Sequence, residues 1–188
     1  QPSPDTRIFQ WDACSGYYYA DSTINGFSHT HLSGTGCGDY GDVLLMPTVG
    51  RQDYHAMGKK SQQMAYASPF SHGREKAEPG YYSVFLDRYG VQAELTSTKR
   101  AAIHRYTFPK SGKAGFILDL DYSLQRQKNE EMKLEVISDT EIRGHKKTVY
   151  WAFDQYINFY AKFSKPFTYT MVTDSMALDE GEPLLPTA

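Results

Sequence analysis

An alternation of apolar and polar residues runs through Val91-Gln92-Ala93-Glu94-Leu95-Thr96-Ser97, near the middle of this 188-residue chain. A period of two is typical of a β-strand that packs one face on a core and turns the other toward water. The same alternation appears over 116–122 and again over 149–159. Further strands are predicted at 42–46, 81–86, 101–108, 134–137, 141–146 and 168–172.

Short turn sequences separate these predicted strands. Arg88-Tyr89-Gly90 and Lys165-Pro166 are two of them, and Gly and Pro are the strongest local breaks in regular structure. Only 129–134 has a helix-forming composition, and 50–79 is predicted to be a long loop with a strand fragment. Short consecutive strands joined by short turns favour a meander that stacks into two layers. The sequence therefore predicts an all-β fold, an antiparallel β-sandwich with little helix.

Composition excludes several classes of partner. The formal net charge is −2, and no basic run is longer than Lys59-Lys60 or Lys146-Lys147, so no nucleic acid is expected to bind. No apolar stretch approaches the roughly 18 residues that a membrane span needs, so no span is expected. Aromatic residues make up 14% of the chain, which suits β-sheets and sugar-binding faces. The two cysteines, Cys14 and Cys37, are too few for a disulfide framework.

The glycine-rich segment 25–42 carries the densest set of reactive and ligand-binding side chains. His29 and His31 alternate on a strand-like stretch, and four glycines follow at positions 34, 36, 38 and 41. Glycine permits a positive φ and lets a ligand approach the backbone closely. Such segments belong at the rim of a site rather than inside a core. We therefore expect this segment to line a site.

Several interpretations of the candidate residues stay open at this point. The pair His29 and His31 has a spacing that can serve a metal, although no third ligand with a fixed spacing is visible. The run 36–42 has the carboxylates and glycines of a calcium loop but lacks the closing Glu. The aromatic run 11–19 suits either a sugar-binding surface or a structural corner. Composition leaves a Ser-His-Asp set open, but no Gly-x-Ser-x-Gly elbow occurs.

Longer motifs carry a resemblance to a known family. Those in the first quarter of the chain are Trp11-Asp12-Ala13-Cys14-Ser15-Gly16-Tyr17, residues 24–37 and Asp39-Tyr40-Gly41-Asp42-Val43-Leu44-Leu45-Met46-Pro47. Those further along are residues 89–96, Thr98-Lys99-Arg100-Ala101, His104-Arg105-Tyr106-Thr107-Phe108-Pro109 and residues 160–167. In these motifs the chain resembles the N-terminal domain of glycoside hydrolase family 92, the exo-acting α-mannosidases common in gut Bacteroidetes.

The resemblance implies a two-domain enzyme of which this chain is the N-terminal part. Residues 1–188 would form a single β-sandwich domain of the galactose mutarotase-like kind, and a C-terminal (α/α)₆ barrel of the same polypeptide would carry the catalytic acid and base. The implied reaction is hydrolysis of terminal α-linked mannose from glycans such as N-glycans, with inversion and with Ca²⁺ in the full-length enzyme. No catalytic residue or metal ligand is expected in this chain, which alone is expected to be inactive. Extracellular target glycans imply a periplasmic, secreted or cell-surface location.

The resemblance also implies which part of this chain binds mannose-containing glycans. The expected substrate-binding residues are Trp11 and Asp12 near the sugar, with His29, His31, Gly34, Thr35, Gly36 and Cys37 at the rim that faces the barrel. The apolar surface that docks the barrel is expected in 9–19 and 50–79. Two rival hypotheses are a non-catalytic carbohydrate-binding or scaffold module, and a metal-dependent β-barrel enzyme that uses the two histidines.

Overall fold

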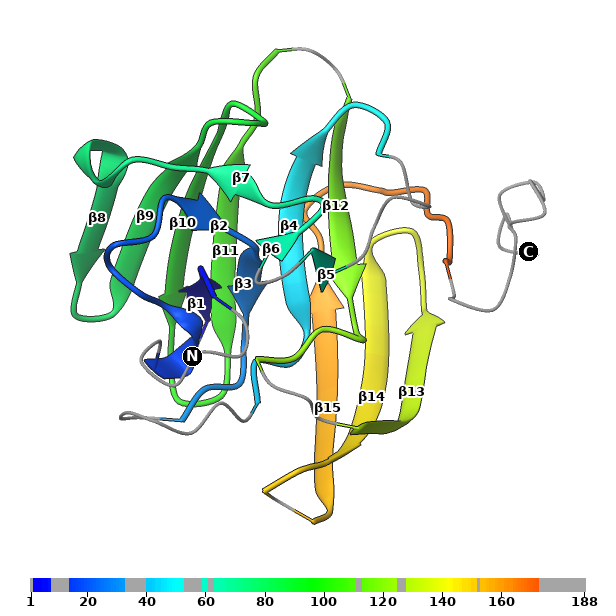
Figure 1. Ribbon diagram of the computed structural model, residues 1–188. Helices are drawn as coiled ribbons and strands as arrows, with labels where there is room; N and C mark the ends of the chain where they lie inside the picture. The colour runs from blue at the N-terminus through cyan, green and yellow to red at the C-terminus, as the bar shows by residue number, and fades with distance from the viewer. Residues whose placement is uncertain are drawn as a thin grey trace. The chain divides into compact units, whose positions relative to one another are not determined.

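The chain folds almost entirely into antiparallel strands (Figure 1). The computed structural model describes residues 2–7, 14–32, 40–52, 59–60, 63–110, 113–124, 128–151 and 153–172. Two compact units are present, Gln1–Lys128 (unit 1) and Asn129–Ala188 (unit 2). Every strand pair among the described residues is antiparallel, which confirms the predicted fold class. The prediction that residues 1–188 form a single domain stays a prediction.

Two four-stranded sheets make up most of unit 1. The first sheet has the order β1-β3-β4-β12, with β1 at Ser3–Asp5, β3 at Gly26–Ser28, β4 at Leu44–Val49 and β12 at Ala114–Asp119. The second has the order β11-β10-β9-β8, with β8 at Glu75–Glu78, β9 at Tyr81–Leu86, β10 at Val91–Ser97 and β11 at Ala102–Thr107. All pairings in the second sheet run between consecutive strands, as the predicted meander requires.

One apolar core joins the two sheets of unit 1. The first sheet contributes Phe27, Leu44 and Met46, and all three are fully buried. The second contributes the buried residues of β9 and β10, including the alternate residues Val91 and Ala93. Two sheets that share one core form a β-sandwich, so the period-2 pattern correctly identified the inward face.

Short elements cross the remainder of unit 1. Two-stranded pairs form between β2 (Thr23–Ile24) and β7 (Ser68–Pro69), and between β5 (Lys59–Lys60) and β6 (Gln63–Met64). The 3₁₀ turns are η1 (Cys14–Gly16) and η3 (His72–Arg74). The predicted long loop at 50–79 therefore contains several short strands, not a single strand fragment. Each described strand of this segment pairs with a neighbouring strand, which satisfies backbone hydrogen-bonding groups.

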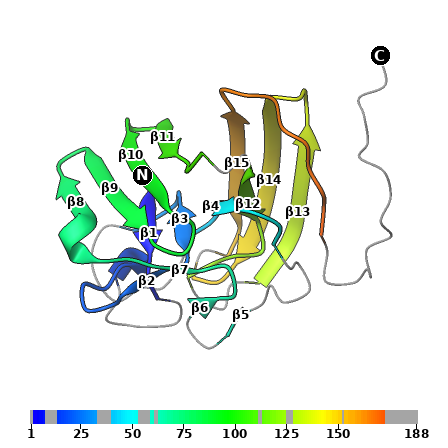
Figure 2. The same cartoon turned by 90° about the horizontal axis from the view of Figure 1, so that it is seen from above.

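Unit 2 is a three-stranded antiparallel sheet, whose strands Figures 1 and 2 both show side by side. Its order is β13-β14-β15, with β13 at Lys128–Val136, β14 at Glu141–Val149 and β15 at Gln155–Lys162. One face is buried and carries Ile142 and Gln155. The other face is exposed and carries Tyr156 and Tyr160.

Two sequence predictions about elements are wrong, and one compositional signal was misleading. Residues 129–134, whose composition favours a helix, form part of β13, and their polar side chains pair across the sheet: Glu130, for example, forms an ion pair with Lys147 of β14. The predicted strand 149–159 is interrupted by the turn that joins β14 to β15, where Phe153 is 83% exposed. Residues 168–172 form no strand. In 149–159 the apolar alternation continues through the turn, so periodicity alone could not detect the end of one strand and the start of the next.

Candidate functional site

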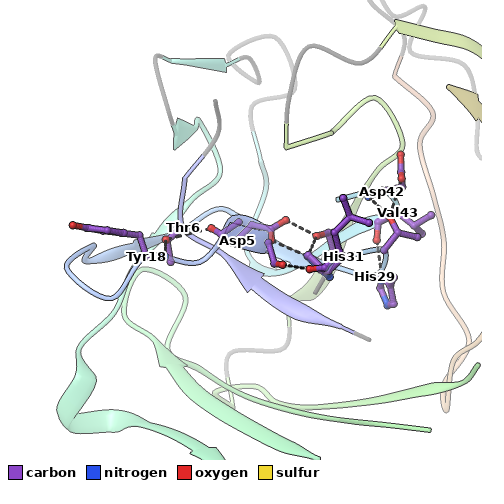
Figure 3. Close-up of polar contacts among 12 residues, drawn as sticks. Asp5, Thr6, Tyr18, His29, His31, Asp42 and Val43 are labelled. Atoms are coloured by element: carbon purple, nitrogen blue, oxygen red, sulfur yellow. Dashed lines mark hydrogen bonds and ion pairs between the residues drawn. The ribbon is translucent and has the colours of Figure 1, made fainter. Parts of the chain in front are cut away.

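A buried hydrogen-bond cluster lies at the end of β3, within the glycine-rich segment 25–42 (Figure 3). His31 Nε2 lies 2.8 Å from Ser28 Oγ and 3.2 Å from Asp5 Oδ1. The Ser28 hydroxyl donates to Asp5 Oδ2 at 2.5 Å. Asp5 on β1 and Ser28 on β3 are both fully buried on neighbouring strands. The cluster therefore joins β1 to the residues that follow β3.

Ser28, His31 and Asp5 are the residue types of a hydrolytic triad, but their geometry differs from that of a triad. In a triad the serine and the carboxylate contact different nitrogens of the imidazole. Here both approach Nε2, and the serine gives its proton to the carboxylate rather than to the histidine. A fully buried Ser28 also cannot meet a substrate. The trio is a structural cluster, and these three residues do not support the Ser-His-Asp interpretation.

A second network connects His29 with the opposite sheet of unit 1. His29 Nδ1 donates to the Val43 carbonyl at 2.6 Å, so Nε2 of the neutral ring is an acceptor. That Nε2 lies 3.1 Å from His104 Nε2 on β11, which then donates. His104 Nδ1 accepts the hydroxyl hydrogen of Tyr106 at 2.7 Å. One set of neutral tautomers therefore satisfies every ring nitrogen between Tyr106 and Val43.

Burial keeps both imidazoles of this network neutral. Burial lowers the pKa of His104 to about 3, and the nearby His29 acts in the same direction. Burial also lowers the pKa of His29, although the hydrogen bond to the Val43 carbonyl opposes that change. A proton added to the acceptor Nε2 of His29 would leave two donors facing each other. The network is therefore compatible with the neutral rings alone.

Within the glycine-rich segment and just after it, residues 29–32 and 40–43 come together as a stem. Thr30 Oγ1 donates to Asp42 Oδ2 at 2.8 Å and accepts the Asp42 backbone N–H at 2.9 Å. Backbone bonds run from the His29 N–H to the Asp42 carbonyl at 3.0 Å and from the Gly41 N–H to the Thr30 carbonyl at 2.7 Å. These bonds fix both ends of the segment against the first sheet.

Backbone strain lies on the outgoing side of the stem. Tyr40 has φ +72° and Val43 has φ +55°. Both values lie in the left-handed region, which a β-branched residue such as Val43 rarely adopts. The Val43 carbonyl accepts the His29 hydrogen bond, so the strained residue forms part of the second network. Such residues cost about 1–3 kcal/mol each and cluster at functional sites. Val43 also explains why β4 begins only at Leu44, two residues later than the predicted strand at 42–46.

The 3₁₀ turn η1, which follows Trp11 and Asp12 in the sequence, contacts the stem. The Ser15 hydroxyl donates to the Leu32 carbonyl, at the incoming side of the stem. Gly16, at φ +84°, backs onto the first cluster, because a Cβ there would lie 2.3 Å from Asp5 Oδ1. The structure therefore brings together the flanks of the two segments that the sequence predicted to bind substrate.

The aromatic run 11–19 has structural partners in its described part. The Tyr17 hydroxyl donates to the two Glu75 oxygens at 3.0 and 3.1 Å. The Tyr19 ring stacks on His72 with centroids 4.2 Å apart. These contacts favour a structural corner at residues 17–19.

The structure describes two of the predicted substrate-binding residues, His29 and His31, and gives both of them hydrogen-bond partners within unit 1. The others lie outside the described residues: Trp11, Asp12, Gly34, Thr35, Gly36 and Cys37. Sequence reasoning from side-chain chemistry missed Asp5, His104 and Tyr106. His104 and Tyr106 belong to the motif 104–109, so the family resemblance could have pointed to these two residues.

Metal binding finds no support in the described part of the chain, where no group of three or more His, Cys, Asp or Glu residues could hold an ion. His29 and His31 turn toward different partners, the Val43 carbonyl and Asp5. The described residues therefore fit neither Ca²⁺ nor a transition metal. None of the described helices is long and apolar enough to cross a membrane.

Two comparisons with known proteins point to the same family. The family model of the glycosyl hydrolase family 92 N-terminal domain matches residues 1–183. A family GH92 α-mannosidase from Bacteroides thetaiotaomicron, solved alone and with mannoimidazole, is 40% identical with a TM-score of 0.80, over 88% of this chain and 22% of that chain. The GH92 family glycosyl hydrolase ccman5 is 28% identical with a TM-score of 0.63, over 85% of this chain and 22% of that chain.

A curated protein extends the likeness beyond bacteria. A relative from Arthroderma benhamiae, called an uncharacterized secreted glycosidase, is 35% identical over 95 residues, which are 50% of this chain and 12% of the relative. The chain thus spans 22% or less of the length of these relatives. Since the family model covers all but its last five residues, the chain belongs to the glycosyl hydrolase family 92 N-terminal domain.

Proposed function

We propose that this chain is the substrate-binding N-terminal part of a longer exo-acting α-mannosidase that hydrolyses terminal α-linked mannose from glycans with inversion. The observation that carries the proposal is the 40% identity, over 88% of the chain, to a GH92 α-mannosidase. That likeness extends over 22% of the relative, which leaves most of such an enzyme to a C-terminal catalytic domain. The partner of this chain is that domain of the same polypeptide.

In this proposal the stem positions the substrate-binding segments. Trp11, Asp12 and the 34–37 loop contact the sugar, while His29 and His31 hold the loop in place through their buried hydrogen bonds. An inverting glycosidase needs an acid and a base roughly 6.5–9.5 Å apart on opposite faces of the sugar. Both carboxyl groups belong to the catalytic domain. The buried Asp5, already held by Ser28 and His31, is unsuited to either role.

Calcium belongs to the same proposal, with its ligands in the rest of the enzyme. The described residues offer no cluster of carboxylates that could hold it. A periplasmic, secreted or cell-surface location also fits, because the targets are extracellular glycans. The name of the Arthroderma benhamiae relative, a secreted glycosidase, supports export.

Hydrolysis of α-1,2-mannobiose with added Ca²⁺ tests the proposal directly. The full-length gene product should release mannose, and the 188-residue chain alone should not. Activity of the chain alone would place the chemistry in its own carboxylates and contradict the proposal. Inactivity of both, with retained sugar binding, would favour the non-catalytic carbohydrate-binding or scaffold module.

Alanine variants of Trp11 and Asp12 in the full-length enzyme test the assigned contacts. Each should lower kcat/KM, since weaker binding of the sugar in the transition state raises the barrier to hydrolysis. Thr98→Ala, in an exposed turn, is the matched control. Unchanged kcat/KM in the Trp11 and Asp12 variants would contradict the assignment.

A further inference from the structure

The exposed face of the unit 2 sheet carries two aromatic rings in one row. Tyr156 and Tyr160 both lie on β15 and are 65% and 59% exposed. Residues four apart on a strand share a face and lie about 13 Å apart. Exposed apolar surface that is shared by neighbouring side chains marks interaction sites, so two rings on one face are a candidate binding surface.

Polar side chains fill the row between the two rings. Tyr156 is opposite Lys147 on β14, Asn158 is opposite His145, and Tyr160 is opposite Arg143. The Lys147 ammonium lies 5.5 Å from the centroid of the Tyr156 ring. Donors and acceptors therefore stand beside each ring on the same face.

An open hollow is lined by residues of all three strands. Its volume is about 560 Å³, and its lining includes Arg143, His145, Asn158 and Tyr160 of this row together with their neighbours Gly144 and Phe159. A volume of this size falls within the range of small-molecule sites, about 300–1,000 Å³. One exposed ring and several hydrogen-bonding groups thus converge on one hollow.

Most of the charges on this face are paired, which restricts the class of ligand. On β14, Lys147 lies 2.9 Å from Glu130 and Arg143 lies 2.9 Å from Glu135, while His145 Nε2 lies 2.8 Å from Glu131 Oε1. On β15, Lys162 lies 2.8 Å from Glu141. An anionic ligand would need cations that are not already engaged by carboxylates. A lipid surface would need an apolar face instead.

We propose that the exposed face of the β13–β15 sheet, with Tyr156 and Tyr160 as stacking rings, binds a neutral oligosaccharide. Sugar rings present CH faces that pack on aromatic rings, and their hydroxyls hydrogen-bond to side chains such as Asn158 and Arg143. The face lies in unit 2, whereas the stem lies in unit 1. It is thus an additional glycan contact, made by other residues than those of the site proposed for hydrolysis.

Native affinity electrophoresis of the full chain tests this proposal. Gels contain soluble α-mannan, dextran or no polysaccharide, and serum albumin serves as the non-binding protein. We expect retardation by at least one of the two polysaccharides. Tyr156→Ala and Tyr160→Ala should each raise the apparent Kd by about three- to tenfold, the usual worth of one aromatic contact. Phe153→Ala, which removes an exposed ring of the β14–β15 turn, should leave it unchanged.

Conservative variants identify the ring as the binding element. Tyr156→Phe and Tyr160→Phe should keep wild-type retardation, since they retain the stacking surface. Retardation that survives both alanine changes would overturn the proposal, as would its absence in every gel. So would hydroxyl-radical footprinting of the full-length enzyme that shows both tyrosines protected without sugar, because a protein segment would then cover the face. The choice of α-mannan rests on the proposed function. Retardation by dextran alone would still support an oligosaccharide-binding face on the β13–β15 sheet, and the hydrolysis assay would test the proposed mannosidase activity independently.

Discussion

At the scale of single residues, Gly16 is a position where a methyl group should be costly. A Cβ there would lie 2.3 Å from Asp5 Oδ1 and 2.6 Å from Leu124 Cδ2, and φ is +84°. We expect Gly16→Ala to lower the free energy of unfolding by about 1–2 kcal/mol for the left-handed backbone. Overpacking should remove about 1–3 kcal/mol more. Urea unfolding followed by circular dichroism measures the loss.

Gly80 provides the matched control for this substitution. It has nearly the same φ, +79°, but nothing lies within 4 Å of its virtual Cβ. Gly80→Ala should therefore show the backbone cost alone. Equal losses in the two variants would mean that Asp5 and Leu124 yield easily, and would contradict the rigid cluster described at the end of β3.

The pH dependence of stability should report the His29–His104 network. The pKa of His104 is lowered to about 3 in the folded protein, whereas an unfolded histidine titrates near 6.5. Between these values the unfolded chain binds a proton that the folded chain does not, so stability is complete above pH ~6.5 and falls as the pH decreases. Each such histidine contributes a slope of about 1.4 kcal/mol per pH unit.

His104→Gln tests which group produces that slope. Unfolding free energies of the wild type and the variant are measured in urea between pH 7 and pH 4. The variant should lose stability at pH 7, because Tyr106 and His29 lose their partner. Its unfolding free energy should nevertheless change less steeply with pH, by an amount that corresponds to at most one bound proton. Thr98→Val, which removes no titratable group, should keep the wild-type slope. An unchanged slope in His104→Gln would show that the ring is charged in the folded state.

At the scale of elements, the stem of the glycine-rich segment depends on a reciprocal pair of bonds between Thr30 and Asp42. Thr30→Val keeps the shape but removes both bonds, which leaves the buried Asp42 N–H without that acceptor. We expect a loss of about 1–3 kcal/mol in thermal or urea unfolding. On the proposed function, kcat/KM of the full-length enzyme should fall as well, since the loop would lose its fixed position.

Thr98 offers a control with the same kind of bonding in an exposed turn. Its hydroxyl accepts the Ala101 N–H at 3.3 Å and lies 3.5 Å from the Ala101 carbonyl. Thr98→Val should change stability by less than about 0.5 kcal/mol, as most surface changes do. If Thr30→Val were equally mild, the stem would not be a rigid support for the loop.

The elements also show how far sequence reasoning reaches. Alternation at 91–97 predicted β10 to the residue, because one face of that strand lies in the core. Composition misled at 129–134, since Glu and Lys favour a helix alone but also suit the exposed face of a sheet whose neighbour carries opposite charges. At the site, the stem residues Thr30 and Asp42 were within the segment singled out. His104 was not, because its partner His29 is 75 residues away and only the folded chain brings them together.

At the scale of the whole molecule, the two units differ in the size of their cores. Unit 1 holds a cluster of fully buried apolar residues shared by two sheets. In unit 2, Ile142 is the only buried apolar residue among those that the structure describes. Local stability follows buried apolar contact, so the strands of unit 2 should open more readily than those of unit 1.

Hydrogen exchange followed by mass spectrometry tests this with two matched strands. Both β10 and β14 are central strands with hydrogen-bonded neighbours on either side, so their edge exposure does not differ. Peptides over 91–97 should exchange about tenfold more slowly than peptides over 141–149, a difference of about 1.4 kcal/mol in opening free energy. If the rates in β14 equalled those in β10, unit 2 would open together with unit 1, and the two units would be one cooperative structure. A slower β10 at every pH would instead identify the sandwich core as the last part of the chain to unfold, with the sheet that carries Tyr156 and Tyr160 opening before it.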